Sequence, residues 1–352
     1  MQIILRILKK STIFAKIKLM RERINWIDWA KFLAITLVVM GHIPMEHGHP
    51  LIVYINSFHM PFFMFLSGYL TKRRYSFQEN WEKDMTSIVL PYLLYNIVFY
   101  PYWATHEYFV GTPTTIVNYI IQPLIGIASC SIITNNVNGP TWFLVALLFS
   151  RITLDIGNRL HHKNLFFLFT AVLLLSLYEV NEFYVFTDRL VFIGFARCFP
   201  YFLIGYLLQN RISIEKSNQI YIRVVAIMTG IISISLSFFI YDISSFMLRI
   251  LVQQIVCICA ITFFTGISIM LNPIKSNVII NISVGTMVIF GLHWAFIGLF
   301  NQVFQHICGI SKMEYSPWQV ILLAIVIEAI LYPLIKKLPP IWLGKKNNYI
   351  KR

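Results

Sequence analysis

The stretch 26-WIDWAKFLAITLVVMGH-42 decides the class of fold. Its middle is an almost continuous apolar run, yet Asp28 and Lys31 lie near one end and His42 closes the other. On an α-helix, 11 residues advance about 16 Å and rotate about 1100°, so Lys31 and His42 share one face. A charge at mid-membrane costs roughly 2.5 to 3.5 kcal/mol, and such residues usually face the interior of a bundle. The stretch therefore predicts a membrane helix with one functional face.

The composition of the whole chain is that of a multi-pass membrane protein. Of its 352 residues, 57% are hydrophobic and 12% are charged, which is too apolar for a soluble enzyme of this length. We predict an all-α, polytopic transmembrane helix bundle with about ten spanning helices of about 20 residues each. The predicted ranges are 27–46, 50–70, 84–104, 140–157, 163–180, 189–208, 219–240, 247–271, 279–305 and 317–336. A further apolar run, 115–133, is interrupted by Gln122, Pro123 and Gly126 and is predicted to be a re-entrant or surface segment.

The basic residues are distributed asymmetrically around these ranges. With the N-terminus inside, 24 of the 29 Lys and Arg residues fall in inner segments, and only Arg189 and Lys312 in outer loops. This positive-inside pattern predicts that both termini are cytoplasmic, and it explains the net charge of +14 without a nucleic-acid partner. Lys31, Arg197 and Arg249 remain within the helices. The predicted regions are a basic, cytoplasmic or interfacial segment 1–25, a membrane domain 26–338 and a basic cytoplasmic tail 339–352.

The second predicted helix, within 55-INSFHMPFFMFLSGYLTKRR-74, also carries polar residues. His59 lies near its middle beside Pro61, which removes a backbone donor and opens room for a polar group. Ser67 and Gly68 are small enough for close helix packing. Lys72, Arg73 and Arg74 follow the helix and could bind phosphates, or could serve only as a stop signal at the inner membrane surface.

These two helices together resemble the opening of the acyltransferase-3 family of bacterial membrane O-acyltransferases. The first family helix has an Arg or Lys, ten residues and a histidine, matched here by Lys31 and His42, and the second resembles 58-FHMPFFMFLSGY-69. Weaker resemblance extends to 139-GPTWFLVALL-148, 196-ARCFPYFLIGYLL-208 and 290-FGLHWAF-296. The sequence around the first two helices also resembles the branch of the family that includes fucose 4-O-acetylases.

The resemblance implies transfer of an acyl group, usually acetyl from acetyl-CoA, to a hydroxyl of a cell-envelope or exported glycan. It implies a place in the bacterial cytoplasmic (inner) membrane. Acetyl-CoA would be a substrate, with succinyl as an alternative acyl group, and no tightly bound cofactor or metal is expected. The expected partners are acyl-CoA, the glycan acceptor, membrane lipid and polysaccharide-biosynthesis proteins.

The candidate site residues follow from this chemistry. Histidine has an ordinary pKa of about 6.5 and suits a general base near neutral pH, so we expect His42 to take the acceptor proton. Arg197 or His293 would polarise the thioester carbonyl or hold the acceptor. The predicted catalytic residues are Lys31, His42, His59, Arg197 and His293; the predicted donor-binding residues are Lys31, Lys72, Arg73 and Arg74; the predicted acceptor-binding residues are Glu46 and Trp142.

Purely structural roles compete with these assignments. Lys31 could pair with Asp28 at the membrane surface, Arg197 could pair with Glu328, and a histidine could be satisfied by a backbone carbonyl. Two other functions also compete: a transporter or flippase for lipid-linked glycan, and a non-catalytic scaffold of a polysaccharide-export assembly. The paired motifs and the missing internal repeat favour the enzyme. Consumption of acyl-CoA would distinguish it from both alternatives.

Overall fold

The computed structural model describes residues 23–46, 48–72, 76–110, 115, 117–129, 137–184, 191–209, 219–309 and 314–345, and every regular element within them is helical. The α-helices are α2 (Asn25–His42), α3 (Pro50–Leu70), α4 (Phe77–Asp84), α5 (Leu90–Val110), α6 (Gln122–Ser129), α7 (Trp142–Gly157), α8 (Lys163–Tyr184), α9 (Val191–Leu207), α10 (Gln219–Ser237), α11 (Phe246–Met270), α12 (Asn277–Val284), α13 (Thr286–Cys308) and α14 (Pro317–Lys337). Two π-helical turns are η1 (Met85–Val89) and η2 (Val117–Ile121), and three 3-10 turns are η3 (Gly139–Thr141), η4 (Ile240–Asp242) and η5 (Pro340–Leu343).

A polytopic helical bundle is confirmed. Within the described part of the chain, seven helices are long and apolar enough to cross a membrane: α3, α7 together with η3, α8, α10, α11, α13 and α14. The remaining three predicted ranges coincide with α2, α5 and α9. Of these, α2 has 18 residues and carries Asp28 and Lys31, and α9 has 17 residues. The predicted count of about ten spans is therefore not established by length and composition.

Several helix boundaries differ from the predicted ones. The first helix was predicted over 27–46, but α2 ends at His42 because Pro44 holds Ile43 in an extended conformation (φ −75°, ψ 127°). The predicted range 279–305 is two helices, α12 and α13, that meet at Gly285. A Cβ at Gly285 would lie 2.3 Å from the Ile335 side chain, so α14 packs directly against this break.

The run 115–133, predicted to be a re-entrant or surface segment, contains the short elements η2 and α6 in its described part. Both lie against α5: the Tyr92 hydroxyl donates to the Ile127 carbonyl and the Tyr100 hydroxyl to the Tyr119 carbonyl. The apolar helix here covers only Tyr119–Ser129, which is too short to span a bilayer.

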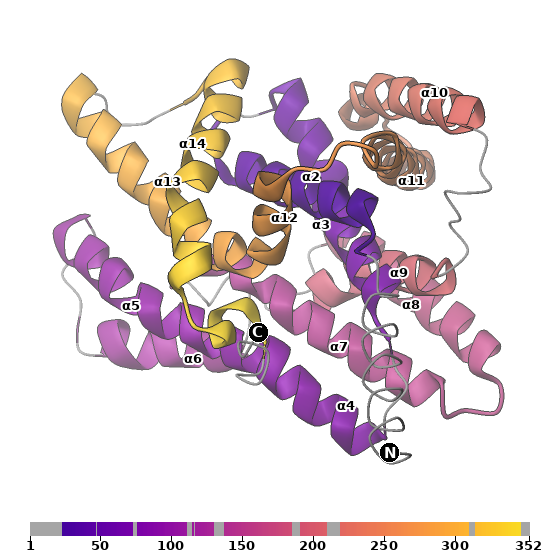
Figure 1. The fold of residues 1–352 in the computed structure, drawn as a ribbon, viewed down its shortest axis with the longest axis horizontal. Coiled ribbons are helices and arrows are strands. Elements are labelled where there is room, and N and C mark those ends of the chain that lie inside the picture. The colour runs from indigo at the N-terminus through magenta and orange to yellow at the C-terminus, as the bar shows by residue number, and fades with distance from the viewer. Residues whose placement is uncertain are drawn as a thin grey trace, which may run out of the picture.

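Helices α2 and α3 occupy the centre of the bundle. In Figure 1 they lie between the pair α10 and α11 on one side and the pair α13 and α14 on the other, with α4 to α7 along the lower edge. Helix α9 packs closely on α3 at two glycines. A Cβ at Gly68 would lie 1.9 Å from the Phe202 carbonyl oxygen, and one at Gly205 would lie 2.0 Å from the Phe65 carbonyl oxygen. The predicted close packing at Gly68 is confirmed.

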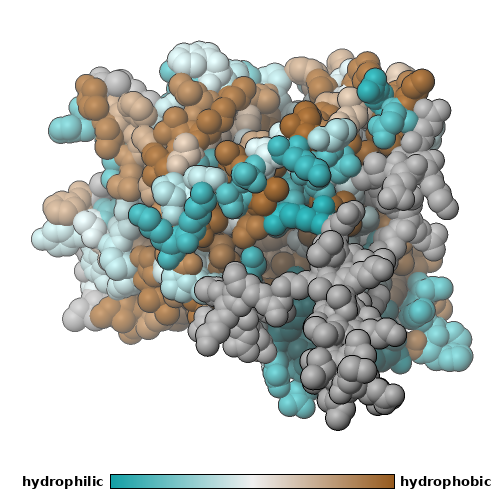
Figure 2. Space-filling view, viewed as in Figure 1, coloured by the Kyte–Doolittle hydropathy of each residue, from teal (hydrophilic) through white to brown (hydrophobic). Residues whose placement is uncertain are grey.

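The outer surface is strongly apolar. Apolar side chains cover much of the face drawn in Figure 2. On α10, Ile220, Val224, Ile227 and Ile231 are each more than half exposed, and their spacing of four, three and four residues places them on one side of the helix. An exposed apolar stripe of this length marks a surface that contacts lipid.

Candidate active site

The charged start of α2 docks against α12. Asp28 is buried and accepts two hydrogen bonds from Arg23, at 2.5 and 2.7 Å, and one from the Ser283 hydroxyl at 2.6 Å. Lys31 donates to the Ser283 carbonyl. The expected direct pair between Asp28 and Lys31 is therefore replaced by a shared contact with Ser283, and Arg23 neutralises Asp28. We name the end of the bundle that carries Arg23, Lys31 and Lys345 the basic end, and the opposite end the far end.

A cavity of about 280 Å³ opens beside Lys31 at the basic end. Three cations line it, namely Lys31, Arg151 and Lys345, and much of the remaining wall is apolar. Arg151 is paired with Asp84 at 2.8 Å, whereas Lys31 contacts a carbonyl. The cavity therefore carries an excess of positive charge, which suits an anionic ligand such as a phosphate.

Lys345 reaches this cavity because the chain after α14 folds back onto the bundle. The Tyr95 hydroxyl donates to the Trp342 carbonyl at 2.7 Å, and the two rings pack edge to face with centroids 5.5 Å apart. Gly344 then turns the chain with φ +63°, a left-handed conformation that glycine adopts without strain. Partial burial, and the positive charge of Arg23, lower the pKa of Lys345 from its ordinary value.

Three histidines meet around the end of α2. The His42 ring lies 5.1 Å from the His293 ring and 6.1 Å from the His59 ring, centroid to centroid. The indole of Trp294 lies 5.5 Å from His42 on another side. His59 and His293 are buried, whereas His42 is partly exposed. The three rings do not form a metal site, because no group of three His, Cys, Asp or Glu in the described ranges could hold a metal ion.

The backbone fixes the tautomer of all three histidines. Each Nδ1 contacts a carbonyl oxygen of its own helix: His42 that of Val38 at 2.8 Å, His59 that of Ile55 at 2.8 Å, and His293 that of Phe290 at 2.8 Å. A carbonyl can only accept, so each Nδ1 carries the proton and each neutral ring keeps its lone pair at Nε2. The Nε2 atom of His293 is buried without a hydrogen-bond partner in the described structure. Each ring is thus prepared to accept a proton.

A second cavity, of about 340 Å³, lies at the far end beside His42. Its walls combine aromatic and polar side chains from α2, α5 and α13. Besides His42 they include Tyr102, Trp103, His106, Glu107, Trp294 and Asn301. Aromatic faces with a few placed polar groups are typical of sites that bind small polar organic ligands.

Both cavities are built on the same two helices. Helix α2 contributes Lys31 to one and His42 to the other, and α13 contributes Phe290 to one and Trp294 to the other. His293 lies between Phe290 and Trp294, and both His293 and Phe290 are at most 3% exposed. The histidine cluster therefore separates a cationic cavity from an aromatic one, about 16 Å apart along α2 by helix rise.

Arg197 lies on the other side of α3 and lines a different cavity from His42. It donates to the Asn56 carbonyl at 2.6 Å, while Glu328 accepts from the Thr36 hydroxyl at 2.7 Å. Arg197 and Glu328 thus bind different elements, and the competing idea that they pair is wrong.

The other predicted site residues lie outside the two cavities or outside the described structure. Glu46 is exposed at the far end. Trp142 lines neither cavity and packs against Gly194 and against Phe143, which lines the basic cavity. Lys72 is exposed just after α3, and Arg73 and Arg74 lie outside the described residues. No observation tests the catalytic or binding roles of these residues, which stay predictions.

Some lining residues had no sequence signal. Lys345 falls in the predicted cytoplasmic tail 339–352, and Arg151 is one of the basic residues of the predicted inner segments. Both enter the cavity through contacts between residues far apart in sequence, such as Arg151 with Asp84. Trp294 lies directly after His293 and Trp103 falls in an apolar range, so composition alone could not distinguish either from a lipid-facing aromatic.

A family model described as an acyltransferase domain matches residues 24–335, which is most of the chain. The chain belongs to the acyltransferase-3 family. The match starts at α2 and ends within α14, so this acyltransferase-3 domain contains the histidine cluster and the far-end cavity, and of the residues that line the basic cavity only Leu343 and Lys345 lie beyond it. Searches among curated proteins and among solved structures found no match.

Proposed function

We propose that this acyltransferase-3 protein transfers an acyl group, primarily acetyl, from acyl-CoA to a hydroxyl of a cell-envelope or exported glycan. The observation that carries the proposal is the order of features along α2 and α13: a cationic cavity, a cluster of three histidines with fixed tautomers, and an aromatic cavity. This order matches what the reaction needs, namely an anionic donor, a base and a sugar-like acceptor.

The donor enters the basic cavity. Coenzyme A carries phosphates, and Lys31, Arg151 and Lys345 supply the charge that attracts them. Lys72 and, by their place in the sequence, Arg73 and Arg74 are predicted to add positive charge for the donor. The thioester arm then extends along α2 towards His42. The donor is a substrate in this proposal, and no tightly bound cofactor takes part.

The acceptor binds in the far-end cavity. The aromatic faces of Tyr102, Trp103 and Trp294 pack against the sugar ring, and Asn301 and Glu107 hydrogen-bond its hydroxyl groups. His42 Nε2 removes the proton from one hydroxyl as its oxygen attacks the thioester carbonyl. The carbon–sulfur bond breaks, the coenzyme A thiolate takes the proton from the His42 imidazolium, and a glycan ester is released.

The proposed topology has ten spans with both termini in the cytoplasm of a bacterial cell, and the protein in its inner membrane. The distribution of basic residues supports this orientation. It makes the basic end cytoplasmic, where acyl-CoA is made, and the far end external, where envelope glycans accumulate. Association with polysaccharide-biosynthesis proteins and membership of the fucose 4-O-acetylase-like branch stay predictions.

The proposed function is tested by supplying radiolabelled acetyl-CoA to membrane vesicles that contain the protein and extracted envelope glycan. We expect label in alkali-labile glycan esters, above the level of vesicles without the protein. Succinyl-CoA in a parallel series measures the choice of donor. Glycan that gains no label from either donor would contradict the enzyme and favour the transporter or the scaffold, since neither consumes acyl-CoA.

A second prediction concerns pH and Lys345. The charged form of Lys345 attracts the donor. An ordinary lysine has a pKa of about 10.4, and because the pKa of Lys345 is lowered, Lys345 loses its charge at a lower pH than an ordinary lysine does. We expect the KM for acyl-CoA to rise towards alkaline pH, with kcat changed less. Lys345→Arg, which keeps its charge, should flatten this rise, and Lys345→Gln should give a high KM at every pH. Identical pH profiles for wild type and Lys345→Arg would contradict the assignment.

A further inference from the structure

A third cavity, of about 350 Å³, lies on the opposite side of α3 from His42. Its polar lining comes from α3, α8, α9 and α11 and includes two arginines, Arg197 and Arg249, one carboxylate, Glu179, and the amides of Gln253 and Asn56. Within the described part of the chain, neither arginine forms an ion pair. Two guanidinium groups against the single carboxylate of Glu179 give this cavity an excess of positive charge, which suits an anionic group.

Pro61 explains why Arg197 is held in this cavity. Proline has no N–H, so the Ser57 carbonyl four residues earlier loses its helical partner. Arg197 and the Gln253 amide both approach that carbonyl, each at 3.4 Å, and Arg197 also donates to the Asn56 carbonyl at 2.6 Å. These contacts use one terminal nitrogen of the guanidinium, Nη2, and leave its other nitrogens for a ligand.

An apolar groove of about 340 Å³ follows this cavity along the same helices towards the basic end. On α9 the lining passes from Arg197 to Tyr201 one turn later, and on α11 from Gln253 to Ile258. The α11 part of the groove continues to Ile269, about 16 Å further by helix rise. The seam between α9 and α11 therefore presents a cationic head and a long apolar channel.

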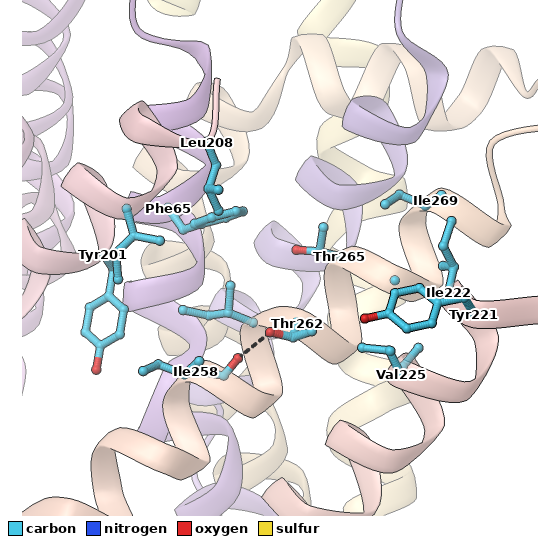
Figure 3. Close-up of a pocket in the computed structure, with 14 residues that line it drawn as sticks. Phe65, Tyr201, Leu208, Tyr221, Ile222, Val225, Ile258, Thr262, Thr265 and Ile269 are labelled. Atoms are coloured by element: carbon cyan, nitrogen blue, oxygen red, sulfur yellow. Dashed lines mark hydrogen bonds between the residues drawn. The ribbon is translucent and has the colours of Figure 1, made fainter. Parts of the chain in front are cut away.

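Figure 3 shows this groove between two groups of side chains. Phe65 and Leu208 lie on one side and Ile222 and Ile269 on the other, and the hydroxyl of Thr265 lies between them. Thr265 is 8% exposed, and its hydroxyl has no hydrogen-bond partner in the described structure, unlike that of Thr262, which donates to the Ile258 carbonyl at 2.8 Å. Ile204 and Ile258 remain partly exposed at the groove, as expected of a channel open to the bilayer.

We infer that this seam binds a phosphate-bearing membrane lipid that carries the acceptor glycan, with the phosphate at Arg197 and Arg249 and a hydrocarbon chain in the apolar groove. The position of Asn56 favours the acceptor over a bulk phospholipid. A methyl group placed on Gly41 would lie 3.2 Å from Asn56 Oδ1 and 3.5 Å from His59 Cε1, so the cationic cavity borders the residue before His42. A glycan attached to the bound phosphate must therefore extend past Asn56 and the end of α2 to reach His42 in the far-end cavity. This inference deepens the proposed function and rests on it for the identity of the glycan.

The test is equilibrium binding of a radiolabelled long-chain polyprenyl monophosphate to the purified full-length protein in detergent, without acyl donor. We expect binding at least tenfold tighter than for the uncharged polyprenol or for phosphatidylglycerol. Arg249→Gln, whose side chain has no described partner to lose, should weaken it tenfold or more. Arg197→Gln should do the same if the variant folds. Ile258→Trp should weaken binding by filling the groove, and Arg159→Gln, an exposed arginine at the α7–α8 turn, is the matched control.

Several results would overturn the inference. Equal binding of polyprenol or phosphatidylglycerol would indicate no preference for a lipid-linked phosphate, and unchanged binding by Arg249→Gln would indicate that the chain neutralises this arginine itself. If inorganic phosphate competes as effectively as the lipid, the apolar groove contributes nothing to binding. If the protein binds the lipid but transfers no acyl group, the proposed function is wrong and this inference stands. If it transfers acyl groups but does not bind the lipid, this inference is wrong and the proposed function stands.

Discussion

Replacing His42 by alanine should lower kcat for acyl transfer by about 10² to 10⁴, with a much smaller change in KM for either substrate. This magnitude is typical for loss of a general base. His42 is the one member of the histidine cluster that lines the far-end cavity, and the hydrogen bond from its Nδ1 to the Val38 carbonyl leaves Nε2 as the proton acceptor. Steady-state kinetics with radiolabelled acyl-CoA and glycan at matched protein levels measure the effect.

Two further variants make this result specific. His162→Ala removes an exposed histidine from the turn between α7 and α8 and should leave kcat unchanged. His293→Ala should lower kcat less than His42→Ala, because His293 is fully buried and reaches no cavity wall directly. A larger loss in His293→Ala than in His42→Ala would transfer the role of base to His293, whose Nε2 is also unpartnered.

Replacing Gly205 by alanine should destabilise the fold by about 3 kcal/mol, at the upper end of the usual cost of overpacking. The added Cβ would lie 2.0 Å from the Phe65 carbonyl oxygen and 2.9 Å from the Tyr69 backbone nitrogen, and a helix backbone cannot move aside as a flexible side chain can. Helices α3 and α9 would have to separate. Thermal unfolding of the protein in detergent, followed by circular dichroism, measures the loss.

Gly139→Ala is the matched control for Gly205→Ala. A Cβ at Gly139 would meet no atom within 4 Å, so the same chemical change should leave the unfolding temperature nearly unchanged. Gly68→Ala should repeat the effect of Gly205→Ala from the other helix, since its Cβ would lie 1.9 Å from the Phe202 carbonyl oxygen. Equal stability of Gly205→Ala and Gly139→Ala would contradict the close crossing of α3 and α9.

Much of the helical layout could be predicted because hydropathy and helix breakers act locally. Each of the ten predicted ranges overlaps a helix, and the packing role of Gly68 followed from its size alone. The break at Gly285 was missed because a single glycine within a helical pattern does not by itself end the helix. The Ile335 side chain of α14 packs where a Cβ at Gly285 would lie, a tertiary contact that local sequence does not reveal.

The candidate site was predictable where one helix defines it. The shared face of Lys31 and His42 follows from helix geometry, and the structure places these residues at the two cavities. Partners across the bundle were not predictable. Asp28 binds Arg23 and Ser283 instead of Lys31, and Ser283 lies 255 residues away. Arg197 shares no cavity with His42, because α3 stands between them.

The dry layer between the two cavities has a bioenergetic consequence. His293 and Phe290 are at most 3% exposed, and the basic and far-end cavities share no lining residue. A continuous aqueous path through a membrane protein would let protons flow down their gradient. A packed layer at this point limits such leakage, and in the proposed reaction only the narrow thioester arm would cross it.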